Sequence, residues 1–573
     1  MIEKQWIDID ASEKIINHLQ ETLKIHPIFC QLLAQRGITN YDEAKLFFRP
    51  ELTHLHDPFL MKGMDKAVIR LEKAIQNQEK ILLYGDYDVD GTTSVALMYS
   101  FLKNHHSNLD YYIPHRHKEG YGISYQGIDY AAENGFSLVI AMDCGIKAMD
   151  KIDYAKAKNI DFIICDHHLP DTKVPDAVAV LDPKQVGCKY PYKELSGCGV
   201  AFKLVQAYVQ KNNLDFKEVT DLLDLLMVSI ACDIVPMTGE NRVLAYFGLQ
   251  HLNDYGREGL RALIAMANRS YPLSISDVVF GIGPMINAAG RLSDAKNAVK
   301  LLLSEDKTEA RDNAEKLKHE NTKRKTFEQG ITAEAIEQFK AVPNWQALKT
   351  VVLYGEYWHK GVLGIVASRM VETFHRPAVI LSKSEDKIVG SARSVHGFDV
   401  HDAIKECEDL LMNFGGHKYA AGMTMPLENL DIFKQRFEKI VSERITEDDL
   451  TPKMKVSANL DFSYLKHDRF WKILKQFAPF GPQNMRPVFR TSNIVAVDGS
   501  KLLKEKHLKL KIKQKLENEE KSPIRDAIAF NMGEYYPHIQ NGQPFELCYT
   551  IEANNWKGRS TLQLMVKDLK FYE

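Results

Sequence analysis

Residues 81–94 read ILLYGDYDVDGTTS and place three aspartates at alternate positions directly after an apolar run. The apolar run predicts a buried strand, and the residues that follow place Val95, Met98 and Leu102 on one face of a helix. Three neighbouring carboxylates repel one another, and burying them is costly unless a partner compensates their charge. A bound divalent cation would compensate it, and so would simple exposure to water.

The alternation of strand and helix continues beyond this stretch. Strand-like runs follow at LDYYIP, FSLVIAMD, IDFIICDHH and DAVAVLDP, and the helix-like runs SYQGIDYAAENG and KAMDKIDYAKAKN lie among them. Such alternation predicts βαβ units and a parallel sheet with helices on both faces, so the expected fold class is α/β. We place this first domain at 61–299, with a mostly helical part at 196–270, after a helical lead-in at 1–60.

The rest of the chain changes character twice. Residues 300–342 are rich in charge and poor in apolar residues, which predicts a solvated connecting helix. A second, smaller α/β unit is expected over 343–448, from the runs KTVVLYG, VLGIVASRMVETF and RPAVILS. Over 449–573, short strand-like runs separated by turn residues predict an all-β barrel or sandwich.

Composition narrows the class of protein. With 573 residues, 45% hydrophobic and 26% charged, the chain is expected to form about three or four globular domains, and disorder is excluded. It contains no apolar stretch of about 18 residues, so no membrane span is predicted. The start MIEKQWIDIDASEK lacks a secretory pattern, and eight scattered cysteines predict reduced thiols in the cytoplasm. The net charge of −2 neither favours nor excludes a nucleic-acid partner.

Acidic and imidazole side chains come directly after three of the predicted strands. They are Asp86, Asp88 and Asp90 after the first, Asp143 after the next but one, and Asp166, His167 and His168 after the following one. Because the carboxyl ends of parallel strands meet at one edge of a sheet, these side chains should lie together. Asp233, at the end of the apolar run LLMVSIACDI, is a further candidate for the same edge.

This set of side chains predicts a divalent metal centre. Oxygen ligands with one or two imidazoles suit Mg²⁺ or Mn²⁺ better than a structural zinc site. The set exceeds the needs of one ion, so we expect a pair about 3.5–4 Å apart, a clamp for displacement at phosphorus. Each acid alone is more often a solvated turn residue, and Asp86 is the weakest ligand candidate. Gly91 is expected to allow a tight turn, and Thr92 and Thr93 to cap the next helix.

The same residues lie in motifs that resemble the DHH phosphoesterase superfamily. These motifs are YGDYDVDGTTS, AMDCGI, CDHHLP and ACDIVPMTGENR. Three further stretches, IPHRHKEGYGIS, GIGPMINAAGRLSDA and NFGGHKYAAGMTM, make the chain similar nearly end to end to the RecJ family within it. The resemblance implies a parallel-sheet DHH catalytic domain, a long connecting helix, a smaller α/β DHH-associated domain and a C-terminal all-β OB-fold domain.

The resemblance also implies roles for the acidic edge. Two Mn²⁺ or Mg²⁺ ions would be held by Asp88, Asp90, Asp143, His167 and Asp233. His168 would lie against the phosphate that is cut, and Asp166 would orient its neighbours from behind. Asp86 is grouped with these two catalytic residues, and its own role is left open.

Further residues are implied to bind the substrate. Those at the 5′ phosphate are Arg116, Ser391 and Arg393, and those of the GGH motif that closes over the strand are Gly415, Gly416 and His417. A guanidinium matches phosphate oxygens, and consecutive glycines let backbone amides approach an anion. From the residues alone, Arg393 could equally be a surface ion-pair partner and His417 a core histidine.

A basic stretch near the C-terminus, KLLKEKHLKLKIKQKL, suggests how the strand could be held. Leu508, Leu510 and Ile512 alternate with Lys509, Lys511 and Lys513, so a strand here should bury one face and present lysines on the other. Such a row can follow a phosphate backbone, but it can also protect an edge strand from aggregation. The nearby Phe477, Phe480 and Phe489 are expected to pack in the core rather than to stack on bases.

The implied function is that of a single-stranded-DNA-specific exonuclease. It would degrade DNA in the 5′–3′ direction to mononucleotides by two-metal hydrolysis, in recombination and repair. A monomer is expected, with single-stranded DNA as substrate and a single-strand-binding protein and a helicase as partners. Two alternatives stay open: a DHH nanoRNase or cyclic-dinucleotide phosphodiesterase, and a catalytically inactive factor that binds single-stranded DNA.

Overall fold

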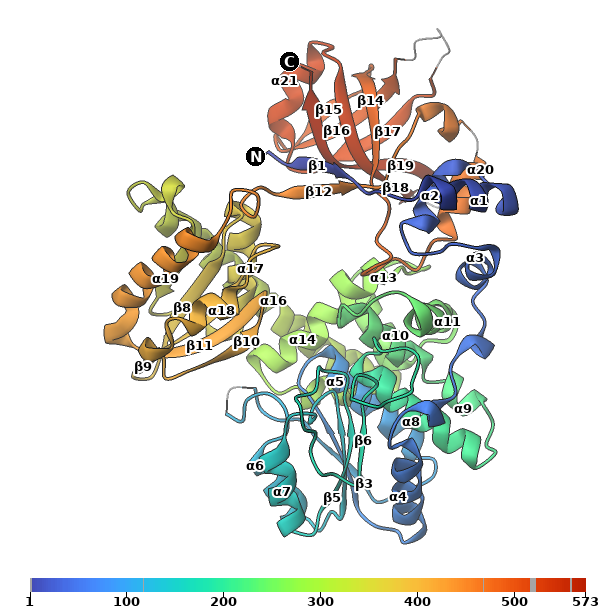
Figure 1. The fold of residues 1–573 in the computed structure, drawn as a ribbon, viewed down its shortest axis with the longest axis vertical. Coiled ribbons are helices and arrows are strands. Elements are labelled where there is room, and N and C mark those ends of the chain that lie inside the picture. The colour runs from blue at the N-terminus through green and yellow to red at the C-terminus, as the bar shows by residue number, and fades with distance from the viewer. Residues whose placement is uncertain (1–2, 117, 467, 516–521, 557–558, 573) are drawn as a thin grey trace.

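A computed structural model gives the structure of the chain, and it describes residues 3–116, 118–466, 468–515, 522–556 and 559–572. Figure 1 shows an α/β unit at the bottom, a second α/β unit to the left and a β barrel at the top, beside which both ends of the chain lie. Among the described residues, no helix is both long and apolar enough to cross a bilayer.

The first unit is built on a five-stranded sheet in the order β3-β2-β4-β5-β6, and all its strands are parallel. The strands are β2 (Ile81–Gly85), β3 (Leu109–Tyr112), β4 (Leu138–Met142), β5 (Asp161–Cys165) and β6 (Ala179–Leu181). One face is covered by α4 (Met64–Gln76), α5 (Val89–Leu102) and α8 (Gly197–Lys211), and the other by α6 (Tyr125–Glu133) and α7 (Met149–Ala157). The predicted parallel sheet is confirmed.

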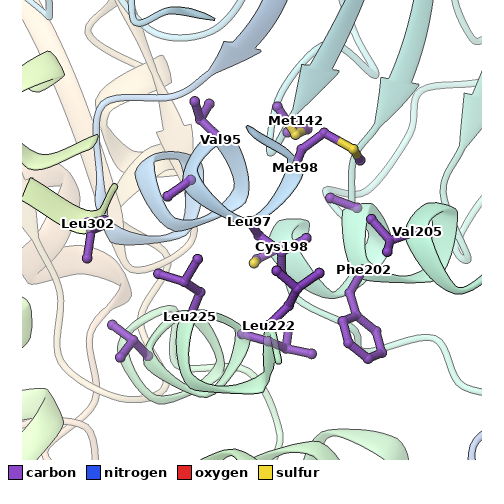
Figure 2. Packing of buried hydrophobic residues seen from close by; sticks show 14 of the residues in the cluster. Val95, Leu97, Met98, Met142, Cys198, Phe202, Val205, Leu222, Leu225 and Leu302 are labelled. Atoms are coloured by element: carbon purple, nitrogen blue, oxygen red, sulfur yellow. The ribbon is translucent and has the colours of Figure 1, made fainter. Parts of the chain in front are cut away.

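One helix beyond the sheet, α10 (Leu223–Cys232), packs against both α5 and α8. It lies with α11 (Gly239–Tyr255) and α12 (Glu258–Met266) in the part expected to be mostly helical. Figure 2 shows Leu97 of α5, Cys198 of α8 and Leu225 of α10 packed together, all fully buried. Each such aliphatic side chain contributes roughly 1.5–3 kcal/mol on burial. This packing sets the relative positions of the three helix ends that carry site residues.

The expected connecting helix is α16 (Lys307–Lys340), which has 34 residues. It is more than a solvated spacer, because it carries a buried stripe. Ala314 and Leu317 join the core of the first unit, whereas Ala335 and Phe339 join the core of the second. The apolar residues are few, but they recur at helical spacing, so one helix is anchored in both cores.

The second unit has a five-stranded sheet in the order β10-β11-β9-β8-β7. Its strands are β7 (Val351–Gly355), β8 (Ala378–Ser384), β9 (Lys387–Arg393), β10 (Asn413–His417) and β11 (Ala420–Pro426). Only β7 and β8 pair in parallel, with α17 (Leu363–Phe374) between them in the chain. The strand β10 forms the edge of the sheet, and α18 (Val400–Lys405) and α19 (Leu430–Arg444) complete the unit.

The C-terminal part is a β barrel, as predicted. Its strands are β13 (Ala458–Asn459), β14 (Phe489–Ala496), β15 (Lys501–Leu503), β16 (His507–Gln514), β17 (Arg525–Ala529), β18 (Phe545–Trp556) and β19 (Arg559–Phe571). The sheet runs β14-β18-β19-β17-β16, and an additional pairing of β16 with β14 closes it. Short helices α20 (Asp468–Lys475) and α21 (Tyr536–Gln540) accompany the strands.

The basic strand β16 shows the expected alternation, since Leu508, Leu510 and Ile512 are buried. The three lysines between them, Lys509, Lys511 and Lys513, are exposed. Because β16 pairs with β17 and with both β14 and β15, it is not an edge strand. The explanation of the lysines as protection of an edge is therefore wrong.

The N-terminal segment packs against the barrel. Its elements are β1 (Gln5–Asp8), α1 (Glu13–Leu23), α2 (Pro27–Ala34) and α3 (Tyr41–Phe48), and β1 pairs in parallel with β12 (Lys453–Val456). Phe477 and Phe489 are fully buried in the core that these helices share with the barrel, which confirms the expected packing. Phe480 is only partly buried, with the guanidinium of Arg486 4.8 Å from its ring centre.

Candidate metal centre

The carboxylates and imidazoles predicted from the strand ends converge in the structure. Three groups each have one donor atom per residue within 4.8 Å of the others. The groups are Asp90, His167 and Asp233; Asp86, Asp88 and Asp143; and Asp143, His167 and His168. Every residue predicted to bind metal belongs to at least one group, and so do Asp86 and His168.

The ring of His167 lies at the centre of the cluster. Its Nε2 is 3.3 Å from an oxygen of Asp143, 3.6 Å from one of Asp233 and 3.8 Å from one of Asp90. These distances join the first turn of α5 and the ends of β4 and β5 to the end of α10. The prediction that Asp233 contributes to the same edge as the strands is therefore confirmed in its geometry.

Asp88 begins helix α5, and this corrects two expectations. Its Oδ1 accepts hydrogen bonds from the backbone N–H groups of Asp90 and Gly91, so Asp88 is the N-cap. Thr92 and Thr93 do not cap the helix, because their hydroxyls donate back to carbonyls of the preceding turn. Gly91 is itself helical, and a Cβ there would come within 2.3 Å of the backbone oxygen of Asp86. Close approach, rather than a turn, requires this glycine.

Asp90 is held by residues far away in the sequence. Its carboxylate accepts hydrogen bonds from the backbone N–H of Gly197 at 2.6 Å, from that of Cys198 at 2.9 Å and from the Ser229 hydroxyl at 2.6 Å. Gly197 also lies against Asp143, where a Cβ would stand 2.6 Å from the Asp143 Cβ. The start of α8 thus supports two candidate ligands at once.

Burial and like charge act on the acids together. Burial, followed by the charges of neighbouring carboxylates, raises the pKa values of Asp86, Asp143 and Asp233 well above the ordinary value. Burial likewise lowers the pKa of His167 and so favours the neutral ring, the form that can ligate a metal. Without a compensating cation, this is an unfavourable concentration of charge.

His168 is in a different state from its neighbour. Its Nδ1 lies 2.8 Å from Asp166, and although burial opposes it, this hydrogen bond and the charge of Asp166 raise the pKa of His168. Asp166 is buried, which would raise its pKa, but hydrogen bonds from His168 and the Ile146 backbone hold that pKa at about 2. The two adjacent imidazoles are therefore pushed in opposite directions, one toward a neutral ligand and the other toward a cation.

The cluster fits a divalent cation. Several of its buried polar atoms have no hydrogen-bond partner in the part of the chain that the structure describes, namely Asp86 Oδ1, both ring nitrogens of His167 and Asp233 Oδ2. Buried polar atoms are rarely left unpaired in proteins, whereas metal ligands must present free lone pairs. Carboxylate oxygens with a neutral imidazole match the preferences of Mn²⁺ and Mg²⁺.

Three arginines form a second group of charged side chains. Arg116 and Arg393 were predicted from the sequence, and Arg291 lies near them. Arg393 donates hydrogen bonds to the Ser391 hydroxyl at 3.1 Å and to the Ala392 carbonyl at 2.7 Å, and no carboxylate of the described residues pairs with it, so the ion-pair explanation is not supported. Arg116 lies over the ring of Tyr87 at 4.8 Å. Burial, then the charges of Arg116 and other arginines, lower the pKa of Arg291 to about 10. Like-charged side chains held together in this way suit a phosphate.

The residues of the GGH motif lie in the second unit, on strand β10. Gly415, Gly416 and His417 are exposed on the edge strand β10, so His417 is not a core histidine. Gly415 has open space around it, and Gly416 has φ +148°, with the Ala420 oxygen 2.3 Å from where a Cβ would be. The structure thus leaves the backbone of this strand accessible to a ligand.

Sequence reasoning missed four residues of the site. They are Gly197 and Ser229, which hold Asp90; Arg291, in the arginine group; and Tyr121, whose hydroxyl lies 3.3 Å from His168 Nε2. Arg291 lies in the stretch GIGPMINAAGRLSDA and Tyr121 in IPHRHKEGYGIS, both of which resemble the family. An arginine and a tyrosine in these stretches could have been chosen as candidates, because both side chains can bind phosphate. Nothing local marks Gly197 or Ser229, since their partner is more than 100 residues away.

Three known domain families match the chain. The DHH family, N-terminal domain, matches residues 80–230, the DHHA1 domain matches 347–443, and the RecJ OB domain matches 456–568. The chain is 38% identical to the single-stranded-DNA-specific exonuclease RecJ of Bacillus subtilis, over 96% of this chain and 69% of that protein. It is 31% identical to RecJ of Escherichia coli, over 95% and 96%. The chain belongs to the RecJ family.

Solved structures of the RecJ family agree in fold. RecJ of Thermus thermophilus in complex with Mn²⁺ is 26% identical, with a TM-score of 0.83, over 99% of this chain and 79% of that chain. The same protein in complex with Mg²⁺ gives a TM-score of 0.77. The expected DHH, DHH-associated and OB-fold architecture is confirmed, and Mn²⁺ or Mg²⁺ is the metal that the acidic edge of this RecJ-family chain can hold.

Proposed function

We propose that this chain is a metal-dependent exonuclease that degrades single-stranded DNA from its 5′ end to mononucleotides. The observation that carries the proposal is the convergence of carboxylates and a neutral imidazole, with unpaired buried donor atoms, beside a group of arginines. Membership of the RecJ family, whose relatives are named single-stranded-DNA-specific exonucleases, supports the same substrate.

The acidic edge would hold two divalent ions, through Asp88, Asp90, Asp143, His167 and Asp233. When bound, such ions acidify a water molecule and neutralise charge on the phosphate. The chain's own residues do the rest. Asp88 and Asp90 are fixed by backbone hydrogen bonds. His168, whose protonated form Asp166 favours, can donate a hydrogen bond to a phosphate oxygen. Asp86, buried within the same cluster, is proposed to support Asp88 and Asp143.

Polarity would come from the group formed by Arg116, Ser391 and Arg393, which we assign to the 5′ phosphate. Gly364, in the first turn of α17, supports this, because a Cβ there would stand 2.8 Å from Arg393 Nη2 and 3.0 Å from Ser391 Oγ. The absence of a side chain leaves room for an anion. Gly415, Gly416 and His417 are proposed to meet the strand from the edge of the second sheet.

Arg393→Ala should impair cleavage of 5′-phosphorylated strands most. Charge-assisted hydrogen bonds contribute about 1.5–3 kcal/mol, so kcat/KM should fall about 10–100-fold on that substrate and much less on a 5′-hydroxyl strand. Steady-state rates on the two substrates measure this. Arg376→Ala is the control. It removes an arginine of the same unit whose contacts among the described residues are with the backbone carbonyls of 345 and 346 and the ring of Trp345. Equal losses on both ends would contradict the assignment.

The lysines of β16 would retain the trailing strand by contacts with its phosphates. Changing Lys509, Lys511 and Lys513 to Glu should weaken the binding of long strands. It should also make the slope of log Kd against log salt shallower by about two, since each of the three lost phosphate contacts contributes about 0.7 on single strands. Cleavage of very short strands should change little. Comparable losses on short and long strands would count against this role.

The alternatives explain less of the chain. A nanoRNase or cyclic-dinucleotide phosphodiesterase would share the metal edge. Its short substrate would not need the closed barrel with its exposed lysines, so this alternative leaves the barrel unexplained. An inactive binding factor would not need to retain every acid of the cluster.

Digestion of a single strand labelled at one end or the other, with Mn²⁺ and with EDTA, tests the proposal. Release of labelled mononucleotide first from the 5′ end, and only with metal, is expected; degradation of dinucleotides alone would overturn it.

Further assignments follow the same proposal. Domain boundaries are placed at 61–299, 300–342, 343–448 and 449–573, and the matched families at 80–230, 347–443 and 456–568 lie within them. None of the eight cysteines forms a disulfide, which suits a reducing cytoplasm. A monomer that works with a single-strand-binding protein and a helicase is the proposed cellular form.

A further inference from the structure

The backbone directly after Asp233 is strained. Helix α10 ends there, with the Asp233 N–H bonded to the Ser229 carbonyl, and Ile234 follows with φ +62°. This is the position after a helix where glycine, or sometimes asparagine, usually takes the left-handed conformation. A β-branched side chain there is a conformational outlier, which costs free energy that the rest of the fold must supply.

Ile234 is unusual even within this chain. Among the non-glycine residues at positive φ in the described part of the chain, it is the only one with an apolar side chain. The others are Lys24, Gln78, Asp143, Asn159, Asn213, Asn268, Asn344, His375, Glu385, Gln483, Asn493, Lys504, Glu505 and Asn531. Strain of this kind persists where the surroundings or the function require it.

The Ile234 side chain has no structural use that would explain the strain. It is 74% exposed, so it contributes little to any core. A second exposed apolar side chain lies in an equivalent place, since Leu169 follows His168 directly and is 72% exposed. The 3.6 Å contact between His167 and Asp233 brings these two segments together. Two exposed apolar side chains therefore flank one acidic cluster.

We propose that Ile234, together with Leu169, forms an apolar contact for the nucleoside joined to the phosphate that is cut. This inference rests on the proposed function and adds a residue that determines substrate binding. The phosphate itself belongs at the acidic edge, and an aliphatic side chain cannot bind it. The nearest apolar surfaces of a DNA strand are the C–H groups of the deoxyribose and the face of the base. Contact with them would remove the Ile234 side chain from water, which is favourable for an apolar surface.

The test is Ile234→Asn, compared with Ile234→Val. Asparagine adopts the left-handed region more readily, so this variant should keep or raise the melting temperature while it removes the apolar contact. We expect kcat/KM on single-stranded DNA to fall about tenfold, mainly through KM, which corresponds to the loss of one hydrophobic contact. Valine retains most of the apolar side chain and loses one methylene, so it should stay within about fourfold of the original chain.

Glu385→Asn provides a matched control, because Glu385 is exposed, has φ +60° and lies in the turn between β8 and β9. It should leave KM unchanged. The Mn²⁺ concentration for half-maximal activity should be the same in all variants, which shows that Asp233 is undisturbed. A wild-type KM in Ile234→Asn, or a lower melting temperature together with lost activity, would overturn the contact. If the unaltered chain does not degrade single strands, the proposed function fails instead.

Discussion

Asp143→Asn should abolish the nuclease activity of this chain while its fold is retained. Asp143 belongs to two of the three donor groups, so its loss should weaken the proposed two-ion centre as a whole. Asparagine keeps the shape that fits against Gly197 but not the charge. Because the ions would supply both nucleophile and charge neutralisation, we expect kcat to fall by at least about a thousandfold. Digestion of end-labelled single strands with saturating Mn²⁺ measures the loss.

Stability provides the control for this variant. The folded-state pKa values of Asp86, Asp143 and Asp233 are raised, so without metal their ionisation opposes folding. Their unfavourable contribution is absent below the unfolded pKa of about 4 and grows as pH rises through the folded values. Metal-free Asp143→Asn should therefore melt higher than the original chain at pH 8, by about 2–4 °C for each kcal/mol regained. A lower melting temperature would mean that Asp143 is needed for folding.

The position of Asp143 was predictable because it depends on a local pattern. A buried strand of five residues and the side chain directly after it are neighbours in the sequence. The rule that parallel strands present their carboxyl ends at one edge then brings Asp88, Asp143 and His167 together without any knowledge of distances. Asp233 was found in the same way, from the end of an apolar helix.

Other features could not be predicted because they depend on distant partners. Asp90 is held by Gly197 and Ser229, which packing of α5, α8 and α10 brings to it. Thr92 and Thr93 have good capping chemistry, but Asp88 already occupies the N-cap, and only the backbone conformation reveals this. Likewise, the closure of the barrel depends on the register between β14 and β16. The strain at Ile234 could not be predicted either, because the sequence does not show that this isoleucine has a positive φ.

Asp166→Asn should reduce kcat about 10–100-fold, the range typical when an outer partner that orients a residue of a metal site is removed. Asp166 raises the pKa of His168 through the 2.8 Å hydrogen bond and its charge, and so favours the protonated ring. The folded pKa of His168 is raised, so its cationic form is present at low pH and is lost as pH rises through that value. Without Asp166 the pKa falls, and the alkaline limb of the kcat profile should move to lower pH.

A double-mutant cycle separates this role from simple loss of structure. If Asp166 acts through the imidazole, Asp166→Asn should cost little in a chain that already carries His168→Ala, and the two losses should be far from additive. The Asp166 carboxylate also accepts a hydrogen bond from the Ile146 backbone at 2.9 Å, which the asparagine carbonyl can partly replace. Additive losses, or an alkaline limb that does not move, would assign Asp166 to the architecture of the β5 end alone. The pH profile is decisive, because a residue that only supports the fold has no reason to shift the titration of His168.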